Sequence, residues 1–324
     1  SGGAPTIITR LLQDADVVVE NFKAGTMDGL GLGYATLAAI KPDLIYCSIS
    51  GYGQSGPGAG AAAYDGALQA ASGMMSMTGS EASGPTRTGF MPVDMATALQ
   101  ATAAITGALL RKERTGQGQY LDVSMLDTSM VLQALQVANY LNEGTIPALL
   151  GNSSPTRQPT ADAFQTQDGH LQITVIQQDQ TERLFDVLEL SHLLNDDRYA
   201  TEAARIKNFD ACQTAMQSVL TKETTDTWLT AMQAARVPVA AIRSLADALD
   251  DPQLTHRRVL TRTSEDVLAT RDQKAVVTAG YLANQDGPTI RSQPPQLGEH
   301  TDEILSEAGF DYSQIDYWRN EGVI

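Results

Sequence analysis

Residues 37–53, LAAIKPDLIYCSISGYG, carry the pattern that decides the fold. A helical pattern ends at a Pro-Asp break, and an apolar strand, Leu44 to Ile49, then enters a glycine-rich loop. Residues 6–22, TIITRLLQDADVVVENF, repeat this order with a strand at Val17 to Val19. Two successive helix-then-buried-strand units are typical of parallel strands, so we expect an α/β protein with a Rossmann-like, doubly wound sheet.

The carboxyl ends of these strands are where a ligand is expected. In doubly wound sheets, ligands bind beyond the carboxyl ends of the strands. Asn21 to Lys23 follow the first strand, and Ser50 to Gln54 follow the second. Both segments are therefore predicted to contribute to a binding site.

The pattern changes near residue 150, which predicts a second, smaller α/β domain. An Asp168-Gly169 hairpin signal lies between alternating segments, so one face of the second sheet is expected to be solvated. The predicted parts are a large domain (1–150), a small α/β domain (151–250), a turn-rich connector (251–296) and C-terminal helices that return to the large domain (297–324).

Composition limits the possible partners. The 324 residues are 42% apolar and 19% charged, as in a globular protein of one large or two moderate domains. Net charge is −16, from 22 basic and 38 acidic residues, and no basic tract occurs. Nucleic acid and anionic membrane surfaces are therefore disfavoured as partners. An anionic small molecule remains compatible, provided that helix N-termini or single Lys and Arg residues supply donors locally.

Cysteine and histidine positions indicate neither a disulfide framework nor a metal site. Cys47 and Cys212 are far apart, and the four histidines show no metal-ligand spacing. No segment approaches 18 continuous apolar residues, and the N-terminus lacks the layout of a signal peptide. We therefore expect a cytoplasmic protein without a metal.

One carboxylate stands out in residues 89–110, GFMPVDMATALQATAAITGALL. Asp94 is the only charged residue between Arg87 and Arg111, at the head of an apolar run whose spacing predicts a helix packed on most sides. Asp is a favoured N-cap, because it accepts hydrogen bonds from free backbone N–H groups and its charge suits the helix dipole. By itself, the segment is therefore compatible with a purely capping Asp94.

Seven segments together resemble the class III CoA-transferases, the family of formyl-CoA transferase and the carnitine CoA-transferase (CaiB/BaiF-like proteins), in their order along the chain. They span essentially the whole chain, and they are ADVVVENF (15–22), GLGLGY (29–34), LIYCSISGYGQSGP (44–57), YDGALQAASGMMSMTG (64–79), GQGQYLDVSMLD (116–127), PVAAIRSLADALDDPQL (238–254) and LGEHTDEIL (297–305). Single segments would be weak evidence, but their shared order is specific.

The resemblance implies that Asp94 is the catalytic nucleophile, because the family carries its aspartate after a short loop at a helix start. The implied reaction moves CoA from an acyl-CoA to a carboxylic acid through an aspartyl anhydride and an aspartyl-CoA thioester. A helix N-terminus would stabilise the carboxylate and the anionic species formed during acyl transfer.

The resemblance also implies a set of residues that bind coenzyme A. For each of them a structural role is the alternative: a solvated loop lysine, a packed phenylalanine or a core tyrosine. The matching positions are Asn21, Phe22, Lys23, Ala62, Ala63, Tyr64 and Asp65.

Three departures from the family pattern bear on these expectations. Family members carry about 70 residues before the point where this sequence starts, including a first strand, so the sheet is expected to lack strands and to expose an edge. Gly29 stands where some relatives have an arginine for the CoA phosphates, and GNSSPTRQP (151–159) replaces a glycine-run loop that closes over the site. A homodimer, interlocked in the family, is expected here as well.

Two other functions remain open. The α-methylacyl-CoA racemases share the fold but pair the aspartate with a histidine, and this chain has Tyr64 at that position. Proton abstraction needs a poised base, so transfer is favoured over racemisation. A noncatalytic CoA-binding or assembly module is the third possibility, motivated by the short N-terminus.

Overall fold

The computed structural model describes residues 3–262, 275–290, 292 and 294–324. The chain divides into two compact units, of which the first comprises Ser1–Gly151 with Asp302–Ile324 and the second Asn152–Thr301. Residues 251–296, expected from the sequence as a connector, fall in the second unit.

A parallel three-stranded sheet forms the centre of the first unit, which confirms the predicted α/β class. Its strand order is β1 (Val17–Glu20), β2 (Ile45–Ser50), β5 (Gln119–Ser124). Both pairings are parallel, and Ser48 of β2 lies opposite Glu20 on one side and Asp122 on the other. Parallel strands place their carboxyl ends at one edge, so the segments that follow β1 and β2 are brought together there.

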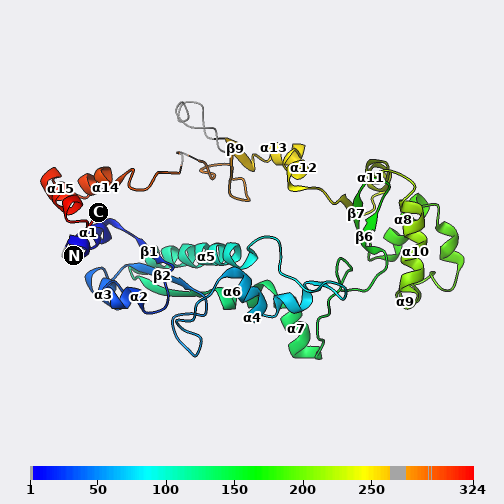
Figure 1. Ribbon diagram of the computed structural model, residues 1–324, viewed down its shortest axis with the longest axis horizontal. Helices are drawn as coiled ribbons and strands as arrows, with labels where there is room; N and C mark the ends of the chain where they lie inside the picture. The colour runs from blue at the N-terminus through cyan, green and yellow to red at the C-terminus, as the bar shows by residue number, and fades with distance from the viewer. Residues whose placement is uncertain (1–2, 263–274, 291, 293) are drawn as a thin grey trace. The chain divides into compact units, whose positions relative to one another are not determined.

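Helices cover both faces of this sheet (Figure 1). On one face, Leu12 and Leu37 pack against Leu44 and Tyr46, and on the other Ala101 packs with Cys47 and Val123 of the strands. The helices of this unit are α1 (Gly3–Asp14), α2 (Thr26–Gly29), α3 (Tyr34–Ile40), α4 (Asp65–Ala71), the 3-10 helix η1 (Met74–Met77), α5 (Pro92–Thr115), α6 (Met125–Leu132) and α7 (Ala134–Glu143). A two-residue pair, β3 (Gly79–Ser80) with β4 (Gly84–Pro85), precedes α5.

The C-terminal residues return to the first unit as α14 (Thr301–Glu307) and α15 (Tyr312–Asn320). They share a small apolar cluster with α1, in which Ile7 packs with Leu305, Ile315 and Trp318. The Trp318 indole also has Phe310 at its edge, with ring centroids 4.8 Å apart. These contacts join the two ends of the described chain to one another.

Helix α5 differs from the sequence prediction of a helix packed on most sides. Its buried side chains are Val93, Thr97, Ala101 and Ala108. Met95, Leu99 and Leu110 are 62%, 71% and 49% exposed, so that prediction is wrong for the single chain. Apolar residues occur all round the helix, but the sheet covers only one side of it. By length and composition, α5 is also the one helix in the described ranges that could cross a membrane, which by itself is weak evidence for a span.

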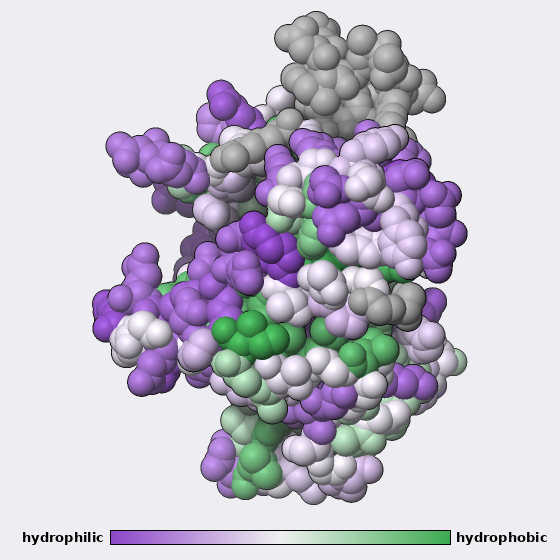
Figure 2. Space-filling model, turned by 90° about the vertical axis from the view of Figure 1, so that its left-hand side faces the viewer, coloured by the Kyte–Doolittle hydropathy of each residue, from purple (hydrophilic) through white to green (hydrophobic). Residues whose placement is uncertain are grey.

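Other large apolar side chains of the first unit lie at its surface. Leu132 of α6 is 47% exposed, and Leu135 and Leu141 of α7 are 67% and 73% exposed. Figure 2 faces the left-hand side of Figure 1, where α1, α3 and α15 lie, and it shows that apolar side chains gather among hydrophilic ones on that side as well. Apolar side chains that gather at a protein surface usually mark a site where another molecule binds.

The second unit is built on an antiparallel sheet. Its strand order is β6 (Ala161–Gln165), β7 (His170–Thr174), β8 (Val239–Ala241), and β6 and β7 form the hairpin expected around Asp168-Gly169. Phe164, Leu171 and Ile173 are buried in the unit's core. Its helices are α8 (Gln178–Val187), the 3-10 helix η2 (Ser191–Asn195), α9 (Glu202–Lys207), α10 (Phe209–Leu220), α11 (Thr225–Ala234), α12 (Leu245–Leu249) and α13 (Pro252–His256), and a further antiparallel pair joins β9 (Leu260–Arg262) to β10 (Ala275–Val277).

Candidate active site

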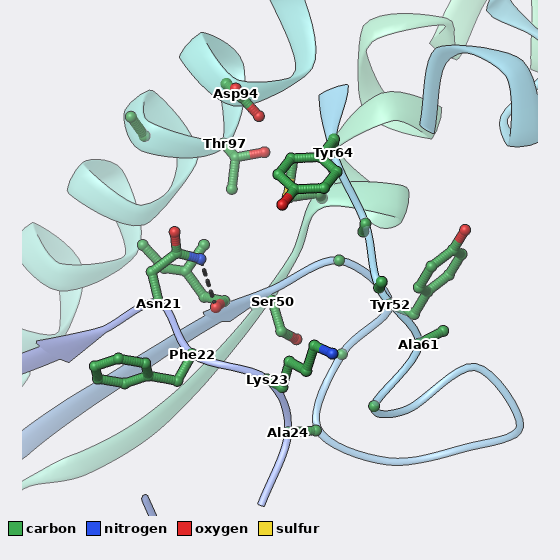
Figure 3. A pocket seen from close by; sticks show the side chains of 18 residues that line it. Asn21, Phe22, Lys23, Ala24, Ser50, Tyr52, Ala61, Tyr64, Asp94 and Thr97 are labelled. Atoms are coloured by element: carbon green, nitrogen blue, oxygen red, sulfur yellow. Dashed lines mark hydrogen bonds between the residues drawn. The ribbon is translucent and has the colours of Figure 1, made fainter. Parts of the chain in front are cut away.

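A cavity of about 620 Å³ opens at the carboxyl ends of β1 and β2. It lies wholly within the first unit, and four segments form most of its wall (Figure 3). They are residues 21–24 after β1, residues 49–53 at the end of β2, residues 60–64 before α4, and Asp94, Thr97 and Ala98 of α5; Met125 of α6 completes the lining. The cavity is therefore at the edge of the sheet where the strand pattern predicted a ligand.

Asp94 contributes the carboxylate of this cavity, and it is not the N-cap of α5. Helix α5 begins at Pro92, its N-cap residue is Met91, and no side chain of the N-cap residue caps it. Within the described residues, the Asp94 carboxylate accepts no hydrogen bond, and Figure 3 shows it projecting from α5 on the same side as Thr97. Partial burial and, second, the negative charge of Asp65 raise the pKa of Asp94. The purely capping role is therefore ruled out by geometry, because the carboxylate is free to meet a ligand.

Asp65 supplies the cap that α5 needs. Its side chain is 5% exposed, and one carboxylate oxygen accepts hydrogen bonds from the backbone N–H of Val93 at 2.8 Å and of Asp94 at 3.1 Å. The family resemblance of the sequence implied that Asp65 is one of the CoA-binding residues. Asp65 does not line the cavity, and its carboxylate is committed to the start of α5.

The segment after β1 brings a free cation to the cavity. The Asn21 amide donates to the carbonyl of Ile49 at 2.9 Å, which ties this segment to the end of β2. Phe22 is 55% exposed, and its N–H donates to the buried carboxylate of Glu20 at 2.8 Å. The Lys23 backbone carbonyl accepts from the Thr26 N–H at 3.0 Å, but its side chain forms no hydrogen bond or ion pair within the described part of the chain. Its ammonium group is therefore available to an anion.

The loop after β2 packs closely against the segment before α4. A Cβ added to Gly51 would lie 2.1 Å from the Cβ of Ala63, so only glycine allows this approach. Gly53 has a φ of 87°, which favours glycine, and the next N–H, that of Gln54, donates to the Asp122 carboxylate at 3.0 Å. Tyr64 is 81% exposed, and its ring lies beside the cavity near Asp94 (Figure 3).

The structure thus brings Asn21, Phe22, Lys23, Ala62, Ala63, Tyr64 and Asp94 together around one cavity, and leaves Asp65 behind its wall. Thr97 and Met125 line the cavity but were not singled out from the sequence. Thr97 lies three residues after Asp94, and this helical spacing could have identified it. Met125 directly follows β5, so its place after the carboxyl end of a third parallel strand could have identified it in the same way.

Comparison with known proteins agrees with this geometry. Residues 2–301 match the family described as CoA-transferase family III. The chain belongs to this family. A protein of the CaiB/BaiF family from Brucella suis has a similar solved structure, with a TM-score of 0.84 and 32% identity over 95% of this chain and 79% of that one. The protein is therefore an enzyme of the CoA-transferase type, with acyl-CoA thioesters as its class of substrate.

Three relatives in this family are named for transfers between dicarboxylic acids. The chain is 34% identical to a succinate–glutarate CoA-transferase of Agrobacterium fabrum, over 93% of this chain and 74% of the relative. It is 35% identical to a succinyl-CoA:mesaconate CoA-transferase of Haloarcula marismortui, over 93% and 76% of the two chains. It is 32% identical to a succinyl-CoA:glutarate CoA-transferase of Mus musculus, over 98% and 72%.

Proposed function

We propose that this enzyme moves CoA between carboxylic acids through covalent intermediates on Asp94. The free carboxylate of Asp94 in the cavity wall is the observation that carries the proposal. Its raised pKa supports the role, because a more basic carboxylate is a better nucleophile in its ionised form. The relatives' names support dicarboxylic acids, among them succinate, as the first acids to test.

The first half of the reaction transfers CoA to the enzyme. A carboxylate oxygen of Asp94 attacks the thioester carbonyl, the C–S bond breaks, and a mixed anhydride and the CoA thiolate form. The thiolate then attacks the Asp94 carbonyl of the anhydride, and the donor acid leaves as a carboxylate. Asp94 now carries CoA as a thioester, so one difficult exchange has been divided into two easier steps.

The second half repeats these steps with the acceptor. The acceptor carboxylate attacks the Asp94 thioester, which releases the thiolate and forms a second anhydride. The thiolate attacks the acceptor's carbonyl, the new acyl-CoA leaves, and the Asp94 carboxylate is regenerated. Each bond that forms replaces one that breaks, so neither an oxidant nor an external proton source is needed.

Residues around Asp94 fit the remaining requirements of this chemistry. Lys23 is placed for a CoA phosphate, since its ammonium group has no partner in the described part of the chain. Small side chains at Ala62 and Ala63 leave room for the pantetheine arm. A reactive anhydride must be kept from water. Met95, which follows Asp94 in α5, and Leu99, about one turn further along, present apolar surface that a partner protein could cover.

A homodimer is part of the proposal. The exposed apolar side chains on α5, α6 and α7 support it, and they include Met95, Leu99, Leu110, Val131, Leu132, Leu135 and Leu141. A second copy of the chain would bury them and would cover the opening near Asp94. Light scattering at micromolar concentration is expected to report twice the chain mass, and a stable monomer would contradict the dimer.

We also propose a cytoplasmic location. Cys47 and Cys212 are free and buried, so the fold uses no disulfide that a reducing compartment would break. Cell fractionation with an antibody against the chain tests this, and recovery with a membrane or secreted fraction would contradict it.

Mass spectrometry after mixing with a panel of acyl-CoAs tests the chemistry. A CoA-mass adduct is expected on the peptide that contains Asp94, and it should be absent from Asp94→Asn. A folded wild-type protein that gives no adduct and no transfer with any donor would refute the proposal, and CoA binding without transfer would favour a noncatalytic module. Deuterium uptake from D2O at the α-carbon of a 2-methylacyl-CoA, without exchange of acids, would indicate the racemase reaction instead.

A further inference from the structure

Three side chains behind the cavity wall form a hydrogen-bonded relay that ends at the nucleophile. One carboxylate oxygen of Asp65 accepts from the N–H groups of Val93 and Asp94, and the other accepts from the Gln69 side-chain amide at 2.5 Å. The Gln69 carbonyl oxygen accepts from the Thr88 N–H at 3.0 Å and from the Thr88 hydroxyl at 3.3 Å. Asp65 and Gln69 are 5% and 1% exposed, so water cannot replace these bonds without unfolding the site.

The direction of every bond in this relay is determined by its ends. The Thr88 N–H can only donate, so the Gln69 carbonyl must face it and the Gln69 NH₂ group must face Asp65. The Val93 and Asp94 N–H groups can also only donate. Asp65 therefore meets donors on both sides and acts only as an acceptor, as a carboxylate does, one hydrogen bond from the nucleophile's backbone.

The relay also explains why the Asp94 side chain is free. Pro92 at the start of α5 has no N–H, and Met91 offers no cap. Val93 and Asp94 thus present the first N–H groups of the helix, and Asp65 accepts from both. If these N–H groups were open, the Asp94 carboxylate could turn back to accept from its own helix, as Asp residues in first turns do.

From this arrangement we infer that Asp65 is a positioning residue whose negative charge keeps the Asp94 carboxylate turned into the cavity and reactive. Gln69 and Thr88 hold that charge in place. The inference rests on the proposed function of Asp94 as nucleophile. Burial is the larger cause of the raised pKa of Asp94, and the charge of Asp65 is the second cause. This second effect agrees with the inference.

Other groups at the cavity were considered for the same effect. Lys23 is a cation and so cannot act in the same direction as an anion, and Tyr64 brings a phenol rather than a carboxylate. Asp65 is thus the anionic group among the described neighbours that acts on Asp94, and it acts from behind the wall, where a bound substrate does not displace it.

A charge relocation tests the inference while every hydrogen bond is kept. In Asp65→Asn the new NH₂ group faces the NH₂ group of Gln69, so one bond is lost. Adding Gln69→Glu restores the pattern: the Asn carbonyl accepts from the two N–H groups, its NH₂ group donates to the Glu, and the Glu accepts from Thr88. The double variant has the same shape and net charge as the wild type, but its charge lies one side chain further from Asp94.

The readout does not depend on turnover. Water-soluble carbodiimide with glycine amide labels protonated carboxyl groups, and peptide mass spectrometry follows the labelling of Asp94 as a function of pH. The midpoint in the double variant is expected to fall by roughly half to one pH unit below that of the wild type, because like charges at greater separation repel less. Thermal denaturation is expected to show that stability is lost in Asp65→Asn and regained in the double variant. In the double variant kcat is expected to be reduced several-fold, while KM for acyl-CoA changes little.

A double variant with the wild-type midpoint and the wild-type kcat would overturn the inference, because it would show that only the hydrogen-bond pattern matters. If the double variant does not fold, the labelling midpoint of Asp94 and kcat are measured in Asp65→Asn, at a temperature below its melting point. Wild-type values of both would again overturn the inference. Failure of the proposed function would be seen separately, as a wild-type protein that forms no CoA adduct while the Asp94 midpoint still responds to Asp65.

Discussion

The close approach of Gly51 to Ala63 offers a quantitative test of how the cavity is built. A Cβ at position 51 would lie 2.1 Å from the Cβ of Ala63, whereas ordinary contacts begin at 3.4 Å. Contacts below 3.0 Å are essentially never seen, so Gly51→Ala must move the loop after β2 and the segment before α4 apart by about 0.9 to 1.3 Å to reach 3.0–3.4 Å. Overpacking of this kind costs about 1–3 kcal/mol of folding free energy.

The same displacement is expected to affect catalysis more than stability. The segment that moves continues into Tyr64 and into Asp65, which caps the helix of Asp94. A misplacement near 1 Å lowers catalytic rates by about 100-fold, because the reacting atoms leave their near-attack geometry. Steady-state transfer kinetics would report the loss in kcat/KM, and differential scanning calorimetry would report the stability.

Gly66→Ala is the matched control. Its Cβ would lie 3.7 Å from the Arg87 guanidinium, an ordinary contact, and position 66 lies within α4. Alanine in a helix is about 0.5–1 kcal/mol better than glycine, so this variant should be as stable as the wild type or slightly more stable, and active. A Gly51→Ala enzyme that melted and turned over like the Gly66→Ala enzyme would refute the reasoning about the close approach.

Three further results are expected. Lys23→Ala should raise KM for acyl-CoA about tenfold with kcat nearly unchanged, since a phosphate contact is made equally in the ground and transition states. Lys23→Arg, the control, should retain most of the affinity. A change in kcat without a change in KM would exclude this role. Activity should be lost as pH falls through the pKa of Asp94, because the nucleophile must be ionised; burial and Asp65 raise that pKa above the ordinary 3.8, so an acid limb in log kcat/KM at or below 3.8 would contradict the burial argument. Burial raises the pKa of the Cys212 thiol to about 11 and also raises the pKa of Cys47. Both thiols should therefore resist a disulfide reagent at pH 8 until the protein is denatured. Rapid labelling of the native protein would show that the packing around them is open.

Local sequence signals were sufficient to predict the sheet and the edge at which the cavity opens. The predicted strands at Val17 to Val19 and Leu44 to Ile49 differ from β1 and β2 by one residue at their ends. A continuous apolar run bounded by a turn and a glycine loop has few other structures open to it, because burial on both faces is the only way to remove it from water. Parallel pairing then brings Asn21, Lys23 and Ser50 to one edge without further information.

The surroundings of Asp94 depended on contacts between distant residues. The cap on α5 comes from Asp65, which lies 28 and 29 residues before the N–H groups that it accepts from, and no local pattern in the sequence marks such a pairing. An Asp at a helix start looks the same whether it caps its own helix or is displaced from that task by another carboxylate.

Periodicity likewise could not decide what covers each side of α5. The spacing of Met95 and Leu99 records that these side chains are apolar, but whether they are buried depends on what packs beside them. The sequence by itself therefore determined the strands, the helix that carries Asp94 and the edge of the sheet where the cavity opens, because these follow from backbone hydrogen bonding and the burial of local apolar runs. Only the tertiary structure decided that the Asp94 carboxylate is free, that Asp65 lies behind it, and that one side of α5 is exposed, since each of these is a relation between segments far apart in the chain.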